Sequence, residues 1–162
     1  MTGSTKGDLT VDQKIAPYLW FDDRLEEAVN FYVSVFPNTK ILNITHQGDK
    51  AFTANFILDG VEFMGLNGGP QFTFTEAVSF FVKCTDQAEV DRYWNVLTAN
   101  GGEEGQCGWL KDRFGLSWQI VPNALMDYLG DPDPGRSGRA MQAMLQMKKI
   151  VITELALAAD AA

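Results

Sequence analysis

The residue types best suited to chemistry are scarce in this chain, and none has an evident partner. His46 is the only histidine and precedes a Gln47-Gly48-Asp49 turn, where a solvated loop histidine is a simpler interpretation than a general base. Cys107 could act as a nucleophile, but the histidine lies about sixty residues earlier and no activating base is evident. Cys84 and Cys107 fit no zinc-binding spacing, so both are interpreted as buried, reduced thiols.

Carboxylates and glycines give only isolated signals. Glu103 and Glu104 are adjacent, and neighbouring residues of a strand point to opposite faces, so the two cannot share a substrate. Glu62 could serve as a general acid or base only if the register of its strand is shifted by one residue. The glycine-rich stretch over residues 101–108 lacks the spacing that holds phosphates between a strand and a helix, and is interpreted as turns and bulges.

The elements that must position these residues begin with a predicted strand over residues 15–21. A helix follows it, because Asp23 and Glu26 have the spacing of a capping box and apolar residues then recur at helical intervals. Asp59-Gly60 is a strong two-residue hairpin signal. Strands are predicted over residues 39–46, 51–58 and 61–67, so the first half has the order βαβββ.

A second copy of this order begins after the Gly68-Gly69-Pro70 linker. The capping pair recurs as Asp86 and Glu89, 63 positions after the first pair, between a predicted strand over 78–84 and another helix. The same offset pairs Phe31 with Trp94, and the Pro37-Asn38 helix stop with Asn100-Gly101. Short strands near Glu103 and Trp109 and one over residues 116–121 complete the copy.

We therefore predict an α+β fold of paired βαβββ modules, over residues 13–67 and 76–122, forming one domain whose sheets curl around a cavity. Residues 1–12 are polar and are predicted to be a disordered segment. Residues 123–162 are predicted to be a C-terminal helical extension. Its apolar stripe at Met141 and Met144 favours packing or a subunit contact.

Composition excludes several functional classes. The 162 residues are 46% apolar and 21% charged, as in a soluble globular protein that needs no metal or disulfide to fold. The net charge of −8 repels phosphates and anionic membrane surfaces, so no nucleic acid or membrane partner is expected. No stretch is apolar enough for a signal peptide or for the roughly 20 residues of a membrane span, which predicts a cytoplasmic protein.

Four segments carry a resemblance to a known family: 17–21 (PYLWF), 27–32 (EAVNFY), 63–70 (FMGLNGGP) and 112–119 (DRFGLSWQ). With them the chain resembles the PhnB-like branch of the vicinal-oxygen-chelate superfamily, which includes glyoxalase I, bleomycin-resistance proteins and extradiol dioxygenases. The resemblance covers about residues 14–150 and implies the glyoxalase/bleomycin-resistance fold and a homodimer. Members of this branch are also labelled as similar to 3-demethylubiquinone-9 3-methyltransferase.

The metal-using members of this superfamily take one ligand from each of four strands, typically His, Glu or Gln. By resemblance, the corresponding positions here are Pro17, Phe63, Ser79 and Gln119. Only Gln119 matches such a ligand, because proline and phenylalanine offer no donor atom and serine binds zinc, nickel or iron weakly. The resemblance therefore predicts no metal at this place and no other cofactor.

Strand alternation predicts an apolar, aromatic cavity with a few neutral polar groups. Such a cavity suits an uncharged or aromatic small molecule, oriented by hydrogen bonds from Ser79, Gln119 and Asn67. The expected ligand-binding residues are Leu19, Phe63, Asn67, Ser79, Phe81, Trp109, Ser117 and Gln119, with Pro17 and Gly65 beside them.

Three functions remain open, and the sequence identifies no catalytic residue. In the first, the protein binds or sequesters a small, largely apolar molecule without a metal. In the second, it is a metal-dependent lyase, isomerase or dioxygenase whose site is rebuilt around Glu62 and Gln119. The third is methyl transfer, which the residues support least: no glycine-rich turn follows the first strand, and paired βαβββ modules do not build a doubly wound sheet.

Overall fold

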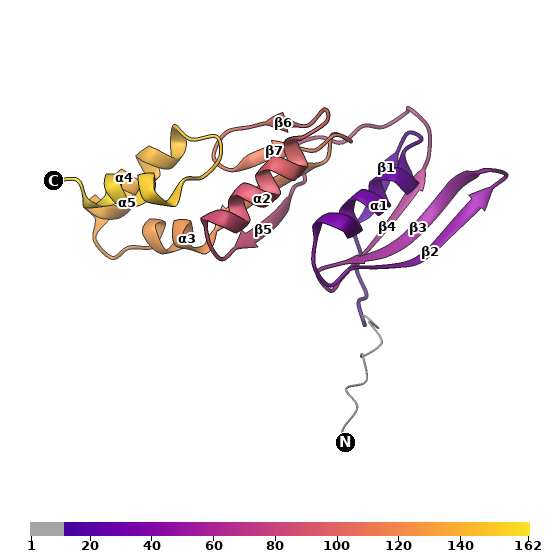
Figure 1. The fold of residues 1–162 in the computed structure, drawn as a ribbon, viewed down its shortest axis with the longest axis horizontal. Coiled ribbons are helices and arrows are strands. Elements are labelled where there is room, and N and C mark those ends of the chain that lie inside the picture. Colours follow the sequence, from indigo (N-terminus) through magenta and orange to yellow (C-terminus); the bar gives the residue numbers. More distant parts are fainter. Residues whose placement is uncertain (1–11) are drawn as a thin grey trace, which may run out of the picture. The chain divides into compact units, whose positions relative to one another are not determined.

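The computed structural model describes residues 12–162, so the disordered segment expected over 1–12 lies, except for Asp12, outside the described residues. The chain divides into two units, one ending at Thr73 and the other running from Phe74 to Ala162. Each contains a four-stranded sheet and the helix that packs on it (Figure 1). The C-terminal helices belong to the second unit.

The first unit has the predicted βαβββ order. Its elements are β1 (Tyr18–Phe21), α1 (Leu25–Val35), β2 (Lys40–Gln47), β3 (Lys50–Leu58) and β4 (Val61–Asn67). The sheet order is β1-β4-β3-β2, with β1 parallel to β4 and the other pairs antiparallel. The hairpin predicted at Asp59-Gly60 is present, with φ of 46° and 77° at the two residues, as a type I′ turn requires.

The second unit repeats this topology, with three of its four strands shorter, and adds three helices. Its elements are β5 (Phe80–Cys84), α2 (Gln87–Thr98), β6 (Glu103–Glu104), β7 (Trp109–Lys111), β8 (Ser117–Pro122), α3 (Asn123–Leu129), α4 (Pro134–Leu145) and α5 (Ile152–Asp160). The sheet order is β5-β8-β7-β6, again with the first pair parallel. The predicted α+β fold with two βαβββ modules is thus confirmed.

The two capping pairs behave differently. In α2, the Asp86 side chain accepts a hydrogen bond from the Glu89 amide at 2.9 Å, as predicted. The N-cap residue of α1 is Arg24, which makes no side-chain cap. Instead, Asn67 Oδ1 at the end of β4 accepts from the Leu25 amide at 2.9 Å. The predicted box at Asp23 is therefore wrong, because a side chain from another strand satisfies the first turn.

The constant offset of 63 is also wrong for the helices. Trp94 is almost fully buried in α2, but in α1 the fully buried aromatic residue is Tyr32, and Phe31 is only half-buried. Helix α1 begins at Leu25 and α2 at Gln87, so the helices are offset by 62 positions and not by 63. A difference of one residue changes the direction of a side chain on a helix by about 100°, so matching landmarks do not imply matching faces.

Helix α1 covers one face of the first sheet, and Gly65 identifies that face. A Cβ atom added to Gly65 would lie 2.8 Å from Leu25 Cδ1 of α1. Leu19 is the β1 partner of Gly65, and Phe63 is two residues away on the same strand, so both share the helix-covered face. Phe63 stacks on Phe56, with ring centroids 5.6 Å apart. This face forms the core of the first unit.

Helix α2 covers one face of the second sheet in the same way. Buried Cys84 lies near Glu89 and Arg92 of α2, so the residues that alternate with it, Val82 and Phe80, share the covered face. Phe80 packs on Trp118, with centroids 5.5 Å apart. The odd-numbered residues of β5 and β8 therefore belong to the opposite face, here called the open face of the second sheet.

Helices α3 to α5 complete a further core in the second unit. Val121, Leu125, Met147, Ile150 and Leu155 form one buried cluster, with Met144 packed against it. Met141 is 41% exposed, so of the two methionines in the predicted stripe only Met144 packs against this core. Within residues 12–162, no helix is both long and apolar enough to cross a bilayer.

Candidate functional site

The open face of the second sheet brings together five of the expected ligand-binding residues, Ser79, Phe81, Trp109, Ser117 and Gln119. Gln119 Nε2 donates a hydrogen bond to Ser79 Oγ at 2.9 Å. Gln119 on β8 is the cross-strand partner of Phe81 on β5 and of Trp109 on β7. An amide therefore lies between two aromatic residues across three neighbouring strands, and Phe81 is 46% exposed.

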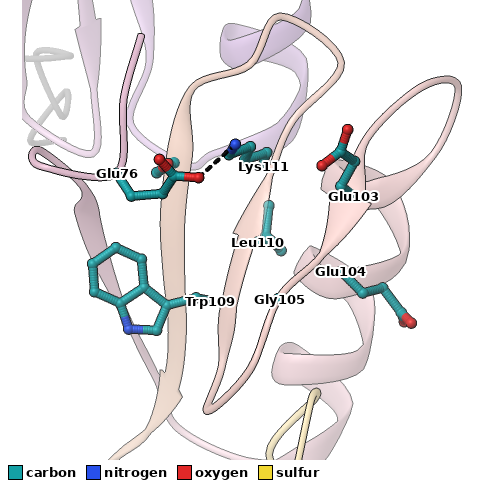
Figure 2. Close-up of a pocket in the computed structure, with 8 residues that line it drawn as sticks. Glu76, Glu103, Glu104, Gly105, Trp109, Leu110 and Lys111 are labelled. Atoms are coloured by element: carbon teal, nitrogen blue, oxygen red, sulfur yellow. Dashed lines mark ion pairs between the residues drawn. The ribbon is translucent and has the colours of Figure 1, made fainter.

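In the second unit, one hollow lies at each end of the cross-strand row formed by Phe81, Gln119 and Trp109. One, of about 160 Å³, is drawn in Figure 2 and includes Trp109 and Ser117. The other, of about 430 Å³, lies beside Phe81 where β5 and β8 meet α3, and includes Met126. Because β8 separates β5 from β7 in the sheet, Gln119 occupies the position between them.

The smaller hollow is lined by a second cross-strand row. Lys111 on β7 is the partner of Ser117 on β8 and of Glu103 on β6. Lys111 Nζ lies 2.5 Å from Glu76 Oε1 (Figure 2), and the hydrogen bond from Lys111 holds the pKa of Glu76 below its usual range. Ser117 is 1% exposed, and its Oγ has no hydrogen-bond partner among the described residues.

Replacing Ser117 by alanine is expected to raise the stability of the protein by about 1 kcal/mol, because a buried hydroxyl without a partner loses its hydration on folding and gains nothing in return. The measurement is the free energy of unfolding from urea titration. Ser137→Ala is the matched control, since that hydroxyl is bonded to the Pro134 carbonyl on α4. A loss of stability in Ser117→Ala would show that bound water or another group satisfies the hydroxyl.

The structure places the expected ligand-binding residues of the first unit under α1. Leu19 and Phe63 are buried beneath that helix, and Asn67 caps it and also donates to the Ala51 carbonyl at 2.9 Å. The face assigned to these three residues from the sequence is therefore wrong. Pro17 and Gly65 alternate with Leu19 and Phe63 in the same register, so they belong to the same face.

The error is a shift of one residue in register. Ser79 and Pro17, taken as equivalent, are 62 positions apart, whereas Leu19 is 63 positions from its helix-facing counterpart Val82. Because side chains alternate along a strand, a count wrong by one exchanges the two faces. Gly65 gave the missing signal, since a glycine inside a strand often marks a close approach by another element.

Glu62 consequently lies on the face of the first sheet opposite to α1, here called the open face of the first sheet. Asn55 Nδ2 donates to Glu62 Oε1 at 3.2 Å, and the Gln13 side chain exchanges two hydrogen bonds with the Glu62 backbone, both at 3.0 Å. Trp20 shares this face by alternation and donates to the Gly69 carbonyl at 2.9 Å. From the sequence, Glu62 could act as an acid or base only if the register of its strand was shifted by one residue. The strand has this shifted register in the structure.

The other reactive residue types stay apart from the open faces. The His46 side chain is 43% exposed, with Nε2 3.6 Å from Glu26 Oε2, as expected of a surface histidine. Burial raises the pKa of the Cys84 thiol to about 12, so this cysteine is unreactive. Glu104 accepts from Trp94 Nε1 at 2.7 Å on the α2 side of the sheet, opposite to Glu103, as predicted.

The donor atoms on the open face of the second sheet do not fit a tightly bound zinc or iron. Ser79 Oγ already accepts the Gln119 hydrogen bond, and neutral hydroxyl and amide oxygens are weak ligands for these ions. Within residues 12–162, no group of three or more His, Cys, Asp or Glu side chains is arranged to hold a metal.

The duplicated βαβββ unit defines the class of protein, which is that of the glyoxalase/bleomycin-resistance fold. The fosfomycin resistance protein FosX from Mesorhizobium loti has this fold at 14% identity and a TM-score of 0.56, covering 75% of this chain and all of its own. Protein PA1353 from Pseudomonas aeruginosa matches at 20% identity and a TM-score of 0.56, covering 68% of this chain and 98% of its own.

Within this class of fold, the chain can also be assigned to a family. The family model described as 3-demethylubiquinone-9 3-methyltransferase matches residues 13–121, and the chain belongs to this family. The PhnB protein from Bacillus cereus is 32% identical, with a TM-score of 0.64, covering 68% of this chain and 99% of its own. No curated protein matches the chain. Helices α3 to α5 follow the matched residues.

Proposed function

We propose that this PhnB-like protein binds a small, largely apolar or aromatic molecule on the open face of the second sheet, without a metal at the superfamily's site. The observation that carries this proposal is the row Phe81–Gln119–Trp109, in which a hydrogen-bonding amide lies between two aromatic residues. A further part of the proposal is that the protein works as a homodimer in the cytoplasm.

The row has the chemistry of a binding site for planar molecules. Phe81 and Trp109 supply aromatic surface, which binds through burial of apolar area and through ring stacking. The bond from Gln119 to Ser79 fixes the orientation of the amide and leaves the serine hydroxyl hydrogen available as a donor. One fixed polar pair within an apolar surface orients a ligand without attracting ions.

A second candidate function is acid–base chemistry at Glu62. The observation that favours it is the location of this carboxylate on the open face of the first sheet, where Asn55 holds one oxygen and the other remains to accept a proton. Methyl transfer, which the family description suggests, has less support. The β1–α1 connection over residues 22–24 contains no glycine, and neither sheet has the doubly wound order that holds nucleotide cofactors.

Native mass spectrometry of the freshly purified protein tests these alternatives together. The proposal predicts a dimer mass, no stoichiometric metal and, where the ligand survives purification, an added small organic mass. Stoichiometric zinc, nickel, iron or manganese would instead favour the metal-dependent enzyme. Calorimetric titration with S-adenosylmethionine tests methyl transfer, for which the proposal predicts no measurable heat.

Replacing Gln119 by alanine is expected to weaken binding of a neutral aromatic probe, 2-naphthol, by about 1–3 kcal/mol, because a hydrogen bond in a desolvated site is lost. The fold should survive, since Gln119 is only half-buried. Binding is measured by calorimetry and folding by circular dichroism. The matched control is Gln142→Ala, at an exposed position of α4. Equal affinity in both variants would show that the ligand does not use this row.

A further inference from the structure

The smaller hollow of the second unit contains an unexplained polar group. Ser117 Oγ is buried without a hydrogen-bond partner among the described residues, and Ser117 lines the hollow together with Trp109, Lys111 and Glu103. Buried hydroxyls in native proteins are satisfied in the large majority of cases. A group that enters the hollow and bonds to Ser117 would remove this cost.

The charges around the hollow favour a cation. Three carboxylates line it, those of Glu76, Glu103 and Glu104, against the single ammonium of Lys111. Lys111 is paired with Glu76 (Figure 2), and Glu104 accepts a hydrogen bond from Trp94 on the opposite face of the sheet. Glu103 shares the open face with Lys111, its cross-strand partner, and its charge adds to that of Glu76 in raising the pKa of Lys111. The hollow therefore carries an excess of negative charge.

An aromatic side chain completes the site. Figure 2 shows the Trp109 ring and the Glu76 carboxylate on the same side of the strands. An indole face attracts cations through its quadrupole as well as apolar groups through burial. The volume of about 160 Å³ is close to that of cavities that accept a single benzene ring.

We propose that this hollow binds the ammonium group of a small aromatic amine, with Glu103 and Glu76 as counter-ions, Ser117 as a hydrogen-bond acceptor and Trp109 against the ring. The inference rests on the proposed function in one respect: Trp109 belongs to both the hollow and the Phe81–Gln119–Trp109 row. It adds to that function a preference for positive charge, which the neutral Ser79–Gln119 pair does not supply.

Lys111 determines access to Ser117. The two residues are cross-strand partners, so the lysine stem lies beside the hydroxyl. The ion pair with Glu76 is exposed, the two side chains being 35% and 60% accessible, and pairs of this kind constrain a lysine only weakly. An incoming ammonium can therefore displace Lys111 and take its place between Ser117, Glu103 and Glu76.

Three probes of similar shape test the inference on the full chain: benzylamine, benzyl alcohol and benzoate. Each is titrated while the Trp109 indole and Ser117 amide signals are followed by heteronuclear NMR. Benzylamine, which is protonated at pH 7, is expected to shift both signals and to bind about fivefold or more tightly than benzyl alcohol, because only it gains the attraction of the carboxylates. Benzoate is expected to shift neither signal.

Two variants change the preference in opposite directions. Glu103→Gln is expected to weaken benzylamine binding about threefold to fivefold and to leave benzyl alcohol binding unchanged. Lys111→Met is expected to tighten benzylamine binding by a similar factor, because it frees the Glu76 carboxylate, and loss of folding cannot imitate a gain in affinity. Glu154→Gln, an exposed position of α5, is the matched control and should alter neither probe.

Equal affinity for benzylamine and benzyl alcohol would overturn the inference and leave the proposed function standing, since the neutral probe would still occupy the aromatic row. An absence of shifts at Trp109 and Ser117 with benzylamine would also overturn it. The proposed function itself fails separately, on the 2-naphthol comparison of Gln119→Ala with Gln142→Ala.

Discussion

Deletion of residues 123–162 is expected to unfold the second unit. This deletion removes Leu125, Met147, Ile150 and Leu155 from a cluster whose remaining member is Val121. Full burial of such side chains contributes about 1.5–3 kcal/mol each, so the loss of four is on the order of 6–12 kcal/mol. That amount is comparable to the whole stability of an ordinary domain.

Backbone contacts add to this dependence. The Cys107 and Gly108 amides donate to the carbonyls of Met147 and Lys148, both at 2.8 Å. The Gln87 side chain on α2 donates to the Ile150 carbonyl at 3.0 Å and accepts from the Ile152 amide at 2.8 Å. The segment between α4 and α5 thus satisfies polar groups of the family fold, which would otherwise be left without partners.

Heteronuclear NMR of the truncated chain measures the effect, with loss of dispersed signals from residues 74–122 as the expected result. Where the truncated chain is insoluble, two point variants of the full chain test the same dependence. Ile150→Ala is expected to cost about 2–5 kcal/mol, because Ile150 is fully buried. Leu157→Ala, at a position that is 74% exposed on α5, should change stability by less than about 0.5 kcal/mol. A folded, stable 1–122 chain would contradict this account.

Replacing Asp112 by alanine is expected to cost about 3–5 kcal/mol of stability. This carboxylate is 2% exposed and accepts three hydrogen bonds, from the Phe114 amide at 2.9 Å, the Leu116 amide at 3.0 Å and Trp118 Nε1 at 2.9 Å. Alanine would leave three donors without their acceptor. The turn between β7 and β8 would lose its shape, and with it the register that places Gln119 beside Trp109.

Urea titration with tryptophan fluorescence measures this loss. Asp112→Asn keeps the Oδ1 acceptor for the two amides and loses the bond to Trp118, so a smaller cost of about 1–2 kcal/mol is expected. Asp127→Ala, at an exposed position of α3, is the control and should be close to neutral. An Asp112→Ala cost below that of Asp112→Asn would mean that the carboxylate does not organise the turn.

The sequence predicted the fold because its signals were local and repeated. Alternating strands, the Asp59-Gly60 turn and the Asp86 cap each depend on residues that are close in the chain. For the second sheet, alternation from Ser79 also assigned Phe81, Trp109 and Gln119 to a common open face, and the cross-strand register agrees. Their role in binding remains a proposal.

Counting residues between sequence landmarks could not decide which face of the first sheet α1 covers. That depends on the number of residues between β1 and α1, and an error of one residue exchanges Leu19 for Tyr18 and Phe63 for Glu62. Nor could it predict that Asn67 caps α1, since the two residues joined by that bond, Asn67 and Leu25, lie 42 positions apart.

The sequence by itself thus determined the order of elements, the duplication of the βαβββ module and the family, because patterns of neighbouring residues encode each of them. Only the tertiary structure decided which side chains α1 covers, that Asp112 holds the β7–β8 turn through Trp118, and that Ser117, Lys111 and Glu103 form one row. These features depend on strand register and on contacts between segments far apart in the chain, and no local pattern of residue types encodes such distances.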